Sequence, residues 1–271
     1  LVGLDHDAEA LQAAGRNLAE FGDRAVLRQG NFSGMESHLD ALGIAMLDGV
    51  VLDLGVSSYQ LDSPIRGFSF REEGPLDMRM NPSVGISAAE VIAEAEADHL
   101  QRIFREYGEE RWARRVAREI VAVRERQPIE TTLQLAELVS RVVPRVKGPQ
   151  RIHPATRVFQ ALRIYVNGEL DSLRAGIDAA TRRLKVGGRL VVISFHSLED
   201  RIVKQTFRAL SVDCICPPRL AVCACGQKPV ARVVTRKGVR ATAEEVENNP
   251  RARSAVLRAM EKLAAEESHD V

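Results

Sequence analysis

The sequence predicts an α/β fold in which a parallel sheet is interrupted by a helical insertion. Short apolar runs alternate with stretches of helical periodicity up to about residue 53, and the pattern returns after residue 186. No hairpin turn signal separates these runs, which favours parallel strands covered on both faces by helices. Because 45% of the residues are hydrophobic and 28% are charged, a disordered or collagen-like chain is excluded.

The first three predicted strands lead into polar residues. Strands are expected at 1–5, 25–29 and 49–53, and the stretch 8–18 has the spacing of an amphipathic helix. Asp5 and Asp53 close their strands, and Asn31 follows the second one. Ligands of open parallel sheets bind beyond the carboxyl ends of the strands. We therefore expect the binding site at these residues.

From about residue 86 to residue 151 only helical patterns remain, and helices are expected at 87–107, 109–126 and 132–143. In the second helix an apolar stripe recurs at spacings of four, four and three, formed by Trp112, Val116, Ile120 and Val123. The helix also carries arginines that lie mainly off this stripe and are expected to form a solvated basic face: Arg111, Arg114, Arg115 and Arg118.

The rest of the chain returns to the α/β pattern. Pro and Gly residues mark 142–150 as a linker. A helix at 168–185 and strands at 187–195, 230–235 and 254–259 are expected to follow.

Charge is distributed unevenly along the chain. Residues 1–100 contain 6 basic and 17 acidic side chains, whereas residues 101–166 contain 14 basic and 7 acidic ones. The basic middle segment suits a polyanionic partner, although a solvated helix surface without a ligand explains it equally well. No run approaches the roughly 18 apolar residues of a membrane span, and no basic-then-apolar leader opens the chain. We therefore expect a cytoplasmic protein with no membrane partner.

Several dense motifs identify a family. They are Asp48 to Asp62, Arg66-Gly-Phe-Ser-Phe70, Gly74 to Pro82, Tyr107-Gly-Glu-Glu-Arg111, His153 to Asn167, Ile193 to Lys204 and Asn249 to Ser254. From residue 1 to about residue 257 the chain closely resembles the RsmH (MraW) family of bacterial ribosomal RNA methyltransferases. The resemblance implies a class I methyltransferase (Rossmann-like) sheet with an inserted all-helical domain. It also implies methyl transfer from S-adenosylmethionine to N4 of a cytidine in 16S rRNA, with 16S rRNA or the small ribosomal subunit as the partner and no DNA.

The resemblance implies a division of labour along the chain. Residues 1–85 and 152–271 would form a discontinuous S-adenosylmethionine-dependent methyltransferase domain, and residues 86–151 an inserted helical domain that recognises RNA. The family's first strand and its Gly-Gly-His turn, which holds the methionine end of the cofactor, have no counterpart in this sequence. We expect such a segment upstream, and we expect poor cofactor binding by a chain that lacks it.

Four residues are the candidate cofactor contacts by the same resemblance: Asp5 at the ribose, Phe32 by the adenine, and Asp53 and Gln60 to complete the pocket. Independently of the family, an acid at such a strand end accepts hydrogen bonds from both ribose hydroxyls in nucleotide-binding α/β folds. A carboxylate at a helix N-terminus is the structural alternative.

Asp53 is also the candidate catalytic residue. The exocyclic amine of cytosine is a poor nucleophile because its lone pair is delocalised into the ring. During in-line attack on a sulfonium methyl, the nitrogen becomes tetrahedral and gains positive charge, which a carboxylate or carbonyl acceptor stabilises. The acceptor is either Asp53 or the Leu54 carbonyl, and a cap of the following turn is the structural alternative for Asp53.

Further side chains are candidate substrate contacts. Phe68 and Phe70 either stack on a flipped base or pack in the core. His196 either contacts the base or a phosphate, or it has a structural role beside a capping box expected from Ser197 and Asp200. We expect the basic face to bind RNA through its four arginines, Arg111, Arg114, Arg115 and Arg118.

All four cysteines fall within 12 positions, as Cys214-Ile-Cys216 and Cys223-Ala-Cys225. A cytosolic chain argues against disulfides, so a zinc knuckle is one interpretation. The pairs are tighter than the usual C-x2-C spacing, and no metal ligand is assigned from the sequence.

Two other functions remain open. One is a non-catalytic RNA-binding ribosome assembly factor, and the other is a nicotinamide-dependent dehydrogenase, which also uses a strand-end acid at the ribose. Nothing in the sequence supplies hydride chemistry, which disfavours the dehydrogenase. An upstream Gly-Gly-His turn would distinguish the methyltransferase from the assembly factor.

Overall fold

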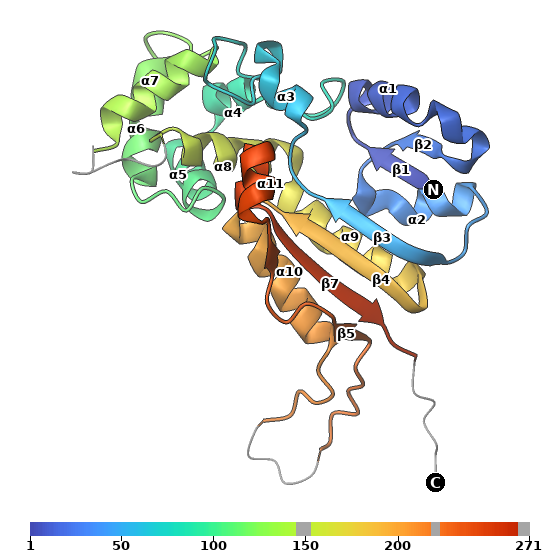
Figure 1. Cartoon of the computed structure of the whole chain (residues 1–271). Helices are drawn as coiled ribbons and strands as arrows, with labels where there is room; N and C mark the ends of the chain where they lie inside the picture. Colours follow the sequence, from blue (N-terminus) through green and yellow to red (C-terminus); the bar gives the residue numbers. More distant parts are fainter. Residues whose placement is uncertain (145–152, 218–222, 265–271) are drawn as a thin grey trace. The chain divides into compact units, whose positions relative to one another are not determined.

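A computed structural model describes residues 1–144, 153–217 and 223–264 of the chain (Figure 1). Internal contacts divide the protein into two compact units, each built from two separate stretches. Unit 1 comprises Leu1–Gln29 and Val56–Glu169, and unit 2 comprises Gly30–Gly55 and Leu170–Val271. The predicted helical insertion falls inside unit 1, and its limits at residues 86 and 151 stay a prediction.

Unit 1 begins with a small parallel sheet. Strand β1 (Val2–Asp5) pairs in parallel with β2 (Val26–Gln29), and α1 (Ala8–Asn17) and the 3-10 helix η1 (Ala19–Arg24) connect them. The strands predicted at 1–5 and 25–29 and the helix between them are thereby confirmed. Asp7 caps α1, since its side chain accepts the N–H of Glu9 at 3.0 Å.

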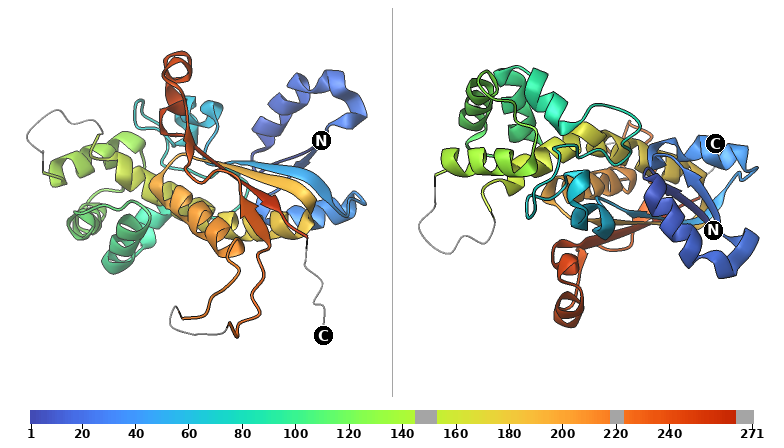
Figure 2. Two further views of the ribbon diagram at one scale, coloured as in Figure 1. Left: turned by 60° about the horizontal axis from the view of Figure 1, so that its bottom comes forward. Right: turned by 90° about the horizontal axis from the view of Figure 1, so that it is seen from above.

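The rest of unit 1 is mainly helical (Figure 2), apart from a long loop at residues 67–87. The helices are α3 (Ser58–Asp62), η3 (Pro64–Arg66), α4 (Ala88–Glu94), α5 (Ala97–Glu106), α6 (Ala113–Arg124), α7 (Thr132–Val142) and α8 (Thr156–Asn167). One hydrophobic core runs through them, with Phe104, Leu135 and Leu162 each completely buried. The helix predicted at 132–143 is confirmed as α7, whereas the predicted linker lies outside the described residues from residue 145 onward.

Two predicted helices of unit 1 are too long. The expected helix at 87–107 is two helices, because Ala95 and Glu96 adopt extended backbone conformations between α4 and α5. The helix expected from Glu109 begins only at Ala113, since Glu109 has a left-handed φ of 49°. Trp112, which was assigned to the apolar stripe, consequently lies at the N-cap and is 43% exposed.

Unit 2 contains a five-stranded mixed sheet with the order β3-β4-β7-β5 and with β6 paired to β7. Strands β3 (Leu47–Asp53) and β4 (Leu184–Ser194) are parallel. Strand β7 (Val256–Lys262) is antiparallel to β4, to β5 (Ala231–Val233) and to β6 (Val239–Arg240). The parallel sheet predicted from the sequence is therefore correct for β1–β2 and β3–β4 and wrong for the C-terminal strands. There β5 pairs with the end of β7 and β6 pairs with its start, and both run antiparallel to β7.

The helices of unit 2 are α2 (Met35–Ala41), α9 (Glu169–Arg183), α10 (Ser197–Leu210) and α11 (Ala243–Asn248), with the 3-10 turns η2 (Phe32–Gly34) and η4 (Pro250–Ser254). Ile177 of α9 and Val203 of α10 are completely buried, as are Leu190 and Val192 of β4. Among the residues that the structure describes, no helix has the length and apolar character needed to cross a membrane.

Candidate active site

Asp5 lies at the carboxyl end of β1, beside the N-terminus of α1. Its Oδ1 accepts the N–H of Asp7 at 2.8 Å. Partial burial raises the pKa of the Asp5 carboxyl above its ordinary value, although the hydrogen bond from the Asp7 N–H opposes this rise. The structure thus places a partly desolvated carboxylate at the strand end, which is the position from which nucleotide riboses are held in such folds.

Gln60 is buried within unit 1 and already has partners. Its Oε1 accepts the N–H of Ser57 at 2.9 Å in the capping box of α3, and its Nε2 donates to Oδ2 of Asp7 at 2.7 Å. Only 4% of Gln60 is exposed. A cofactor contact by this side chain has to use the second amide hydrogen or the second lone pair of Oε1, because Asp7 and Ser57 take the first hydrogen and the first lone pair.

Arg66 is the centre of a buried polar network that the sequence analysis missed. Its Nη1 donates to Oδ2 of Asp7 at 2.7 Å, and its Nη2 donates to the carbonyls of Arg79 and Met80 at 3.2 and 2.8 Å. The side chains of Arg66 and Asp7 are 8% and 2% exposed. Burial alone would raise the pKa of Asp7, but the hydrogen bonds from Arg66 and Gln60 outweigh it and lower that pKa.

Asn167 fixes the same loop from α8. Its Oδ1 accepts the N–H of Met80 at 2.8 Å, and its Nδ2 donates to the carbonyls of Met78 and Arg163, also at 2.8 Å. Met78 is fully buried with a left-handed φ of 63°, a conformation that costs a non-glycine residue roughly 1–2 kcal/mol. Asn167 therefore stabilises a strained loop. The end of the motif from His153 to Asn167 thus has a structural role.

Two glycines of the same motifs are required by close backbone approach. Gly67 has a φ of 73°, and a Cβ there would collide with the backbone of Pro75. A Cβ on Gly74 would collide with the backbone of Pro64. The segment from Arg66 to Pro82 is thus largely a scaffold, held by backbone packing as well as by the Arg66 network.

The two candidate stacking aromatics lie in this scaffold. Phe68 is 8% exposed and belongs to the hydrophobic core of unit 1. The ring of Phe70 is half-buried, with ring centroids 4.7 Å from both His153 and Phe159. This placement favours core packing for Phe68, whereas Phe70 keeps part of its ring accessible.

In unit 2, Asp53 is the last residue of β3. It lies opposite Ile193 of β4, and the N–H of the next residue, Leu54, donates to the Ile193 carbonyl at 3.0 Å. Asp53 is exposed, but partial desolvation and then the negative charge of Glu199 raise the pKa of its carboxyl. Ser57, and not Asp53, caps the following helix α3. The carboxylate is therefore accessible at the strand end.

Phe32 lies at the start of unit 2, in the turn that follows β2 of unit 1. Asn31 shapes this turn, since its Oδ1 accepts the N–H of Ser33 at 2.9 Å and its Nδ2 donates to Oγ of Ser172 at 3.0 Å. The half-buried Phe32 ring packs against Gly176 of α9, where a Cβ would collide with it. One face of the ring is thereby fixed by the protein.

The capping box predicted at Ser197 and Asp200 is wrong by one residue. His196 has an extended backbone and is the N-cap of α10, with Glu199 as its capping-box partner. The Glu199 carboxylate accepts the N–H groups of Phe195 and His196 at 2.7 and 3.2 Å. Asp200 instead accepts two hydrogen bonds from Arg258 at 2.7 and 3.1 Å. The His196 side chain is 10% exposed, and its Nδ1 accepts the N–H of Glu199 at 3.5 Å, which gives it a capping role at α10. A contact of His196 with the base or a phosphate stays a prediction.

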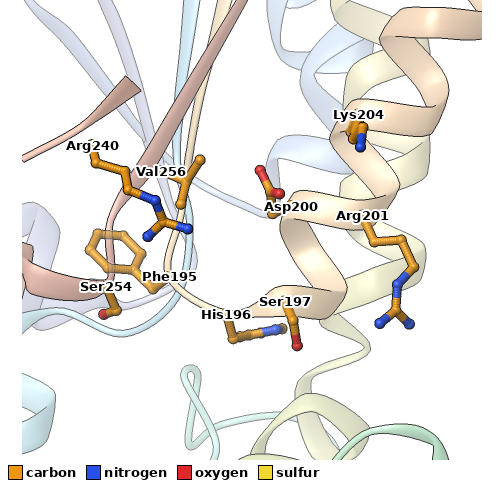
Figure 3. Close-up of a pocket in the computed structure, with 9 residues that line it drawn as sticks. All are labelled: Phe195, His196, Ser197, Asp200, Arg201, Lys204, Arg240, Ser254 and Val256. Carbon is orange, nitrogen blue, oxygen red and sulfur yellow. The ribbon is translucent and has the colours of Figure 1, made fainter. Parts of the chain in front are cut away.

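A hollow of about 450 Å³ lies beside the start of α10 (Figure 3). Its lining comes from the two residues after β4, from α10, from β6, from η4 and from the start of β7. The residues are Phe195, His196, Ser197, Asp200, Arg201, Lys204, Arg240, Ser254 and Val256. Three of these side chains are cationic, and the acid among them, Asp200, is already paired with Arg258. The hollow suits an anionic group such as a phosphate.

A second hollow, of about 460 Å³, lies on the outer face of α6 in unit 1. The hollow is lined by the predicted basic face, together with Trp112, Glu119 and Ala122. The basic face consists of Arg111, Arg114, Arg115 and Arg118. All four arginines are exposed, which confirms the solvated face. The exposed Trp112 among them was not predicted, and an aromatic side chain among cations is typical of surfaces that bind single-stranded nucleic acids.

Comparison with known proteins identifies the family. The model of the MraW methylase family matches residues 1–263. Three relatives called "Ribosomal RNA small subunit methyltransferase H" come from Syntrophotalea carbinolica, Pelobacter propionicus and Symbiobacterium thermophilum, and are 60%, 56% and 52% identical to this chain. The alignments cover 97%, 97% and 98% of this chain and 84% of each relative. The resemblance read from the motifs is thereby confirmed: the chain belongs to the MraW methylase family and is a methyltransferase.

Proposed function

We propose that this enzyme transfers the methyl group of S-adenosylmethionine to the N4 amine of a cytidine in 16S ribosomal RNA. The names of the relatives support a small-subunit rRNA substrate, and such a substrate favours action in the cytoplasm on 16S rRNA or on the small subunit. The observation that carries the proposed chemistry is the accessible, partly desolvated carboxylate of Asp53 at the carboxyl end of β3.

The residues at the strand ends fit the cofactor in chemical character. Asp5 offers a carboxylate at the carboxyl end of β1, which suits the two hydroxyls of a ribose. Phe32 offers a fixed aromatic face, which suits an adenine. When bound, S-adenosylmethionine supplies an electrophilic methyl group on a sulfonium sulfur.

Asp53 acts on the nucleophile in this proposal. As a bond forms between N4 and the methyl carbon, the bond from that carbon to sulfur breaks and the nitrogen becomes positively charged. The Asp53 carboxylate accepts an N4 hydrogen, holds the lone pair in line with the methyl group and takes up the proton that the methylated amine releases. Its raised pKa brings its basicity closer to that needed for this transfer.

Two basic surfaces would hold the RNA. The α6 hollow presents four exposed arginines in unit 1, and the α10 hollow presents Arg201, Lys204 and Arg240 in unit 2. A target cytidine has to be unpaired or flipped for its amine to reach a carboxylate. We further propose that residues 86–151 recognise the RNA, while residues 1–85 and 152–271 hold the cofactor and the reacting base.

The test is product analysis with full-length enzyme. Unmodified 16S rRNA transcribed in vitro, alone or assembled into small subunits, is incubated with methyl-labelled S-adenosylmethionine, digested to nucleosides and separated. We expect the wild type to place the label in N4-methylcytidine and Asp53→Ala to transfer little label. Asp48→Ala is the matched control for Asp53→Ala. Asp48 is an exposed acid near the other end of β3, so this variant should retain activity. Label in 5-methylcytidine or in a ribose methyl would overturn the proposed target atom, and RNA binding without any label would favour the assembly-factor alternative.

A further inference from the structure

The four cysteines of the chain converge at one point of unit 2. The Sγ atoms of Cys214 and Cys223 are 3.5 Å apart, as are those of Cys223 and Cys225. The pairs Cys216–Cys223 and Cys214–Cys225 are 3.9 Å apart, and all four sulfur atoms lie within 4.8 Å of one another. In a tetrahedral site with Zn–S bonds of about 2.3 Å, neighbouring sulfur atoms are about 3.8 Å apart. The observed separations match that geometry.

The chain brings the sulfur atoms together from two arms. One arm leaves α10 and carries Cys214 and Cys216, and the other leads into β5 and carries Cys223 and Cys225 (Figures 1 and 2). The N–H of Val230 donates to the carbonyl of Leu210 at 2.8 Å, which closes the base of the two arms. The cysteines form a further connection between the two arms.

Backbone amides point at the sulfur atoms. The N–H of Ile215 lies 3.4 Å from Sγ of Cys225, and the N–H of Ala224 lies 3.4 Å from Sγ of Cys216. The N–H of Cys216 is at the same distance from Sγ of Cys214. Such donors stabilise the negative charge of thiolates, which is the protonation state that binds a metal. Each arm thus donates to a sulfur atom of the other.

The surroundings of the cluster favour a metal over ordinary packing. Two of the cysteines are exposed and two are half-buried, whereas free cysteines in a core are usually buried. From residue 212 to residue 217 and from 223 to 229, the described chain forms no helix or strand that would hold the arms together. Cys223 has three sulfur neighbours at 3.5, 3.9 and 3.5 Å, an arrangement that suits one shared ion better than two separate disulfides.

We propose that Cys214, Cys216, Cys223 and Cys225 form a structural zinc site that joins the arm at residues 212–217 to the arm at residues 223–229. Four thiolates exclude calcium and magnesium, which prefer oxygen ligands, and they leave no open position for catalysis. The ion cross-links the two arms beyond the Leu210–Val230 hydrogen bond. Its role is to hold these two arms together, independently of the methyl-transfer site.

Metal analysis of the full chain, purified under reducing conditions with zinc supplied, tests the proposal. We expect one zinc per chain, and we expect four equivalents of a mercurial reagent to release it. Because the chain contains only these four cysteines, thiol titration reports on this site alone. Replacement by cobalt should produce the intense visible bands of tetrahedral thiolate coordination.

Two variants distinguish ligation from a general effect on the segment. Cys216→Ser should reduce the zinc content from one per chain to near zero. Ile215→Ser is the matched control, since this 67% exposed side chain lies between two proposed ligands and its backbone N–H is retained. It should keep one zinc.

A third measurement does not depend on any variant. Removing zinc from the wild-type chain should speed proteolysis between residues 211 and 230 and leave cleavage elsewhere unchanged. A chain without zinc, with four freely reactive thiols or two disulfides, would overturn the proposal. Stoichiometric iron would overturn the choice of zinc, and equal zinc in Cys216→Ser and the wild type would overturn the ligand set.

Discussion

Replacing Arg66 by methionine should destabilise unit 1 severely. The substitution keeps the apolar stem but removes the charge that pairs with the buried Asp7 carboxylate at 2.7 Å. It also leaves the carbonyls of Arg79 and Met80 without the donor that reaches them at 3.2 and 2.8 Å. Removing one partner of a buried ion pair costs about 3–5 kcal/mol, a large part of a typical folding free energy of about 5–15 kcal/mol.

Urea unfolding followed by tryptophan fluorescence measures this loss. Trp112 is the only tryptophan of the chain and lies in unit 1, so the signal reports on that unit. Arg118→Met is the matched control, because Arg118 is exposed and lies in the same unit. Substitutions at such surface positions usually change the free energy of unfolding by no more than about 0.5 kcal/mol. A loss of stability in Arg66→Met no larger than in this control would show that the Arg66–Asp7 pair does not stabilise unit 1.

The pH dependence gives the same prediction a second readout. Hydrogen bonds from Arg66 lower the pKa of Asp7 in the folded chain. Their stabilisation is therefore fully present above the unfolded aspartate pKa of about 3.9 and is lost as the pH falls through the lowered folded value. The difference in free energy of unfolding between wild type and Arg66→Met should be largest at neutral pH and should become smaller below about pH 4. A difference that grows with acidity would contradict this assignment.

Three further outcomes follow from the proposed site. In the full-length protein, Asp5→Ala should weaken S-adenosylmethionine binding by about 1–3 kcal/mol, and calorimetry that shows unchanged affinity would refute the ribose contact. The double variant Arg114→Ala, Arg118→Ala should bind RNA more weakly, and its slope of log affinity against log salt concentration should be smaller by about one to two units. Its cofactor affinity should be unchanged. An unchanged slope in filter binding would show that this face does not bind RNA. The acid limb of the single-turnover rate should lie above the ordinary aspartate pKa, because Asp53 must be ionised and its pKa is raised. Glu199→Gln removes a negative charge that contributes to this rise, so it should move the limb to lower pH, and a shift to higher pH would contradict the assignment.

Local patterns were sufficient to predict the strand ends. Asp5 and Asp53 close apolar runs of four or more residues, and both lie at carboxyl ends of parallel strands in the structure. The basic face of α6 followed from helical spacing in the same way. These features depend on neighbours within a few residues, which the sequence displays directly.

Contacts between distant residues were not predictable in this way. Asp7 and Arg66 are 59 positions apart, and Asn167 reaches a loop that lies 87 positions earlier in the chain. Neither pairing leaves a periodic signal, although Arg66, Met80 and Asn167 fall in the motifs. The antiparallel β7 was missed for the same reason, because strand direction is decided by the path of the chain and not by local composition.

The start of α10 shows how a local rule fails. Serine is a better N-cap than histidine by preference, and Ser197 with Asp200 fits the expected spacing. The extended backbone at His196 moves the helix boundary by one residue, so Glu199 completes the box and Asp200 pairs with Arg258. A tertiary ion pair, invisible in the local pattern, thus takes the residue that the pattern had assigned to the cap.

In the proposed mechanism, the Asp53 carboxylate assists the cytidine amine as it becomes tetrahedral. Single-turnover transfer of labelled methyl by full-length Asp53→Ala, at saturating RNA and cofactor, measures this contribution. Because the contact strengthens in the transition state, the rate should fall by about 10² or more, while RNA binding changes little. A variant that transfers methyl at a nearly normal rate would contradict this role of Asp53 and would assign the acceptor role to the Leu54 carbonyl.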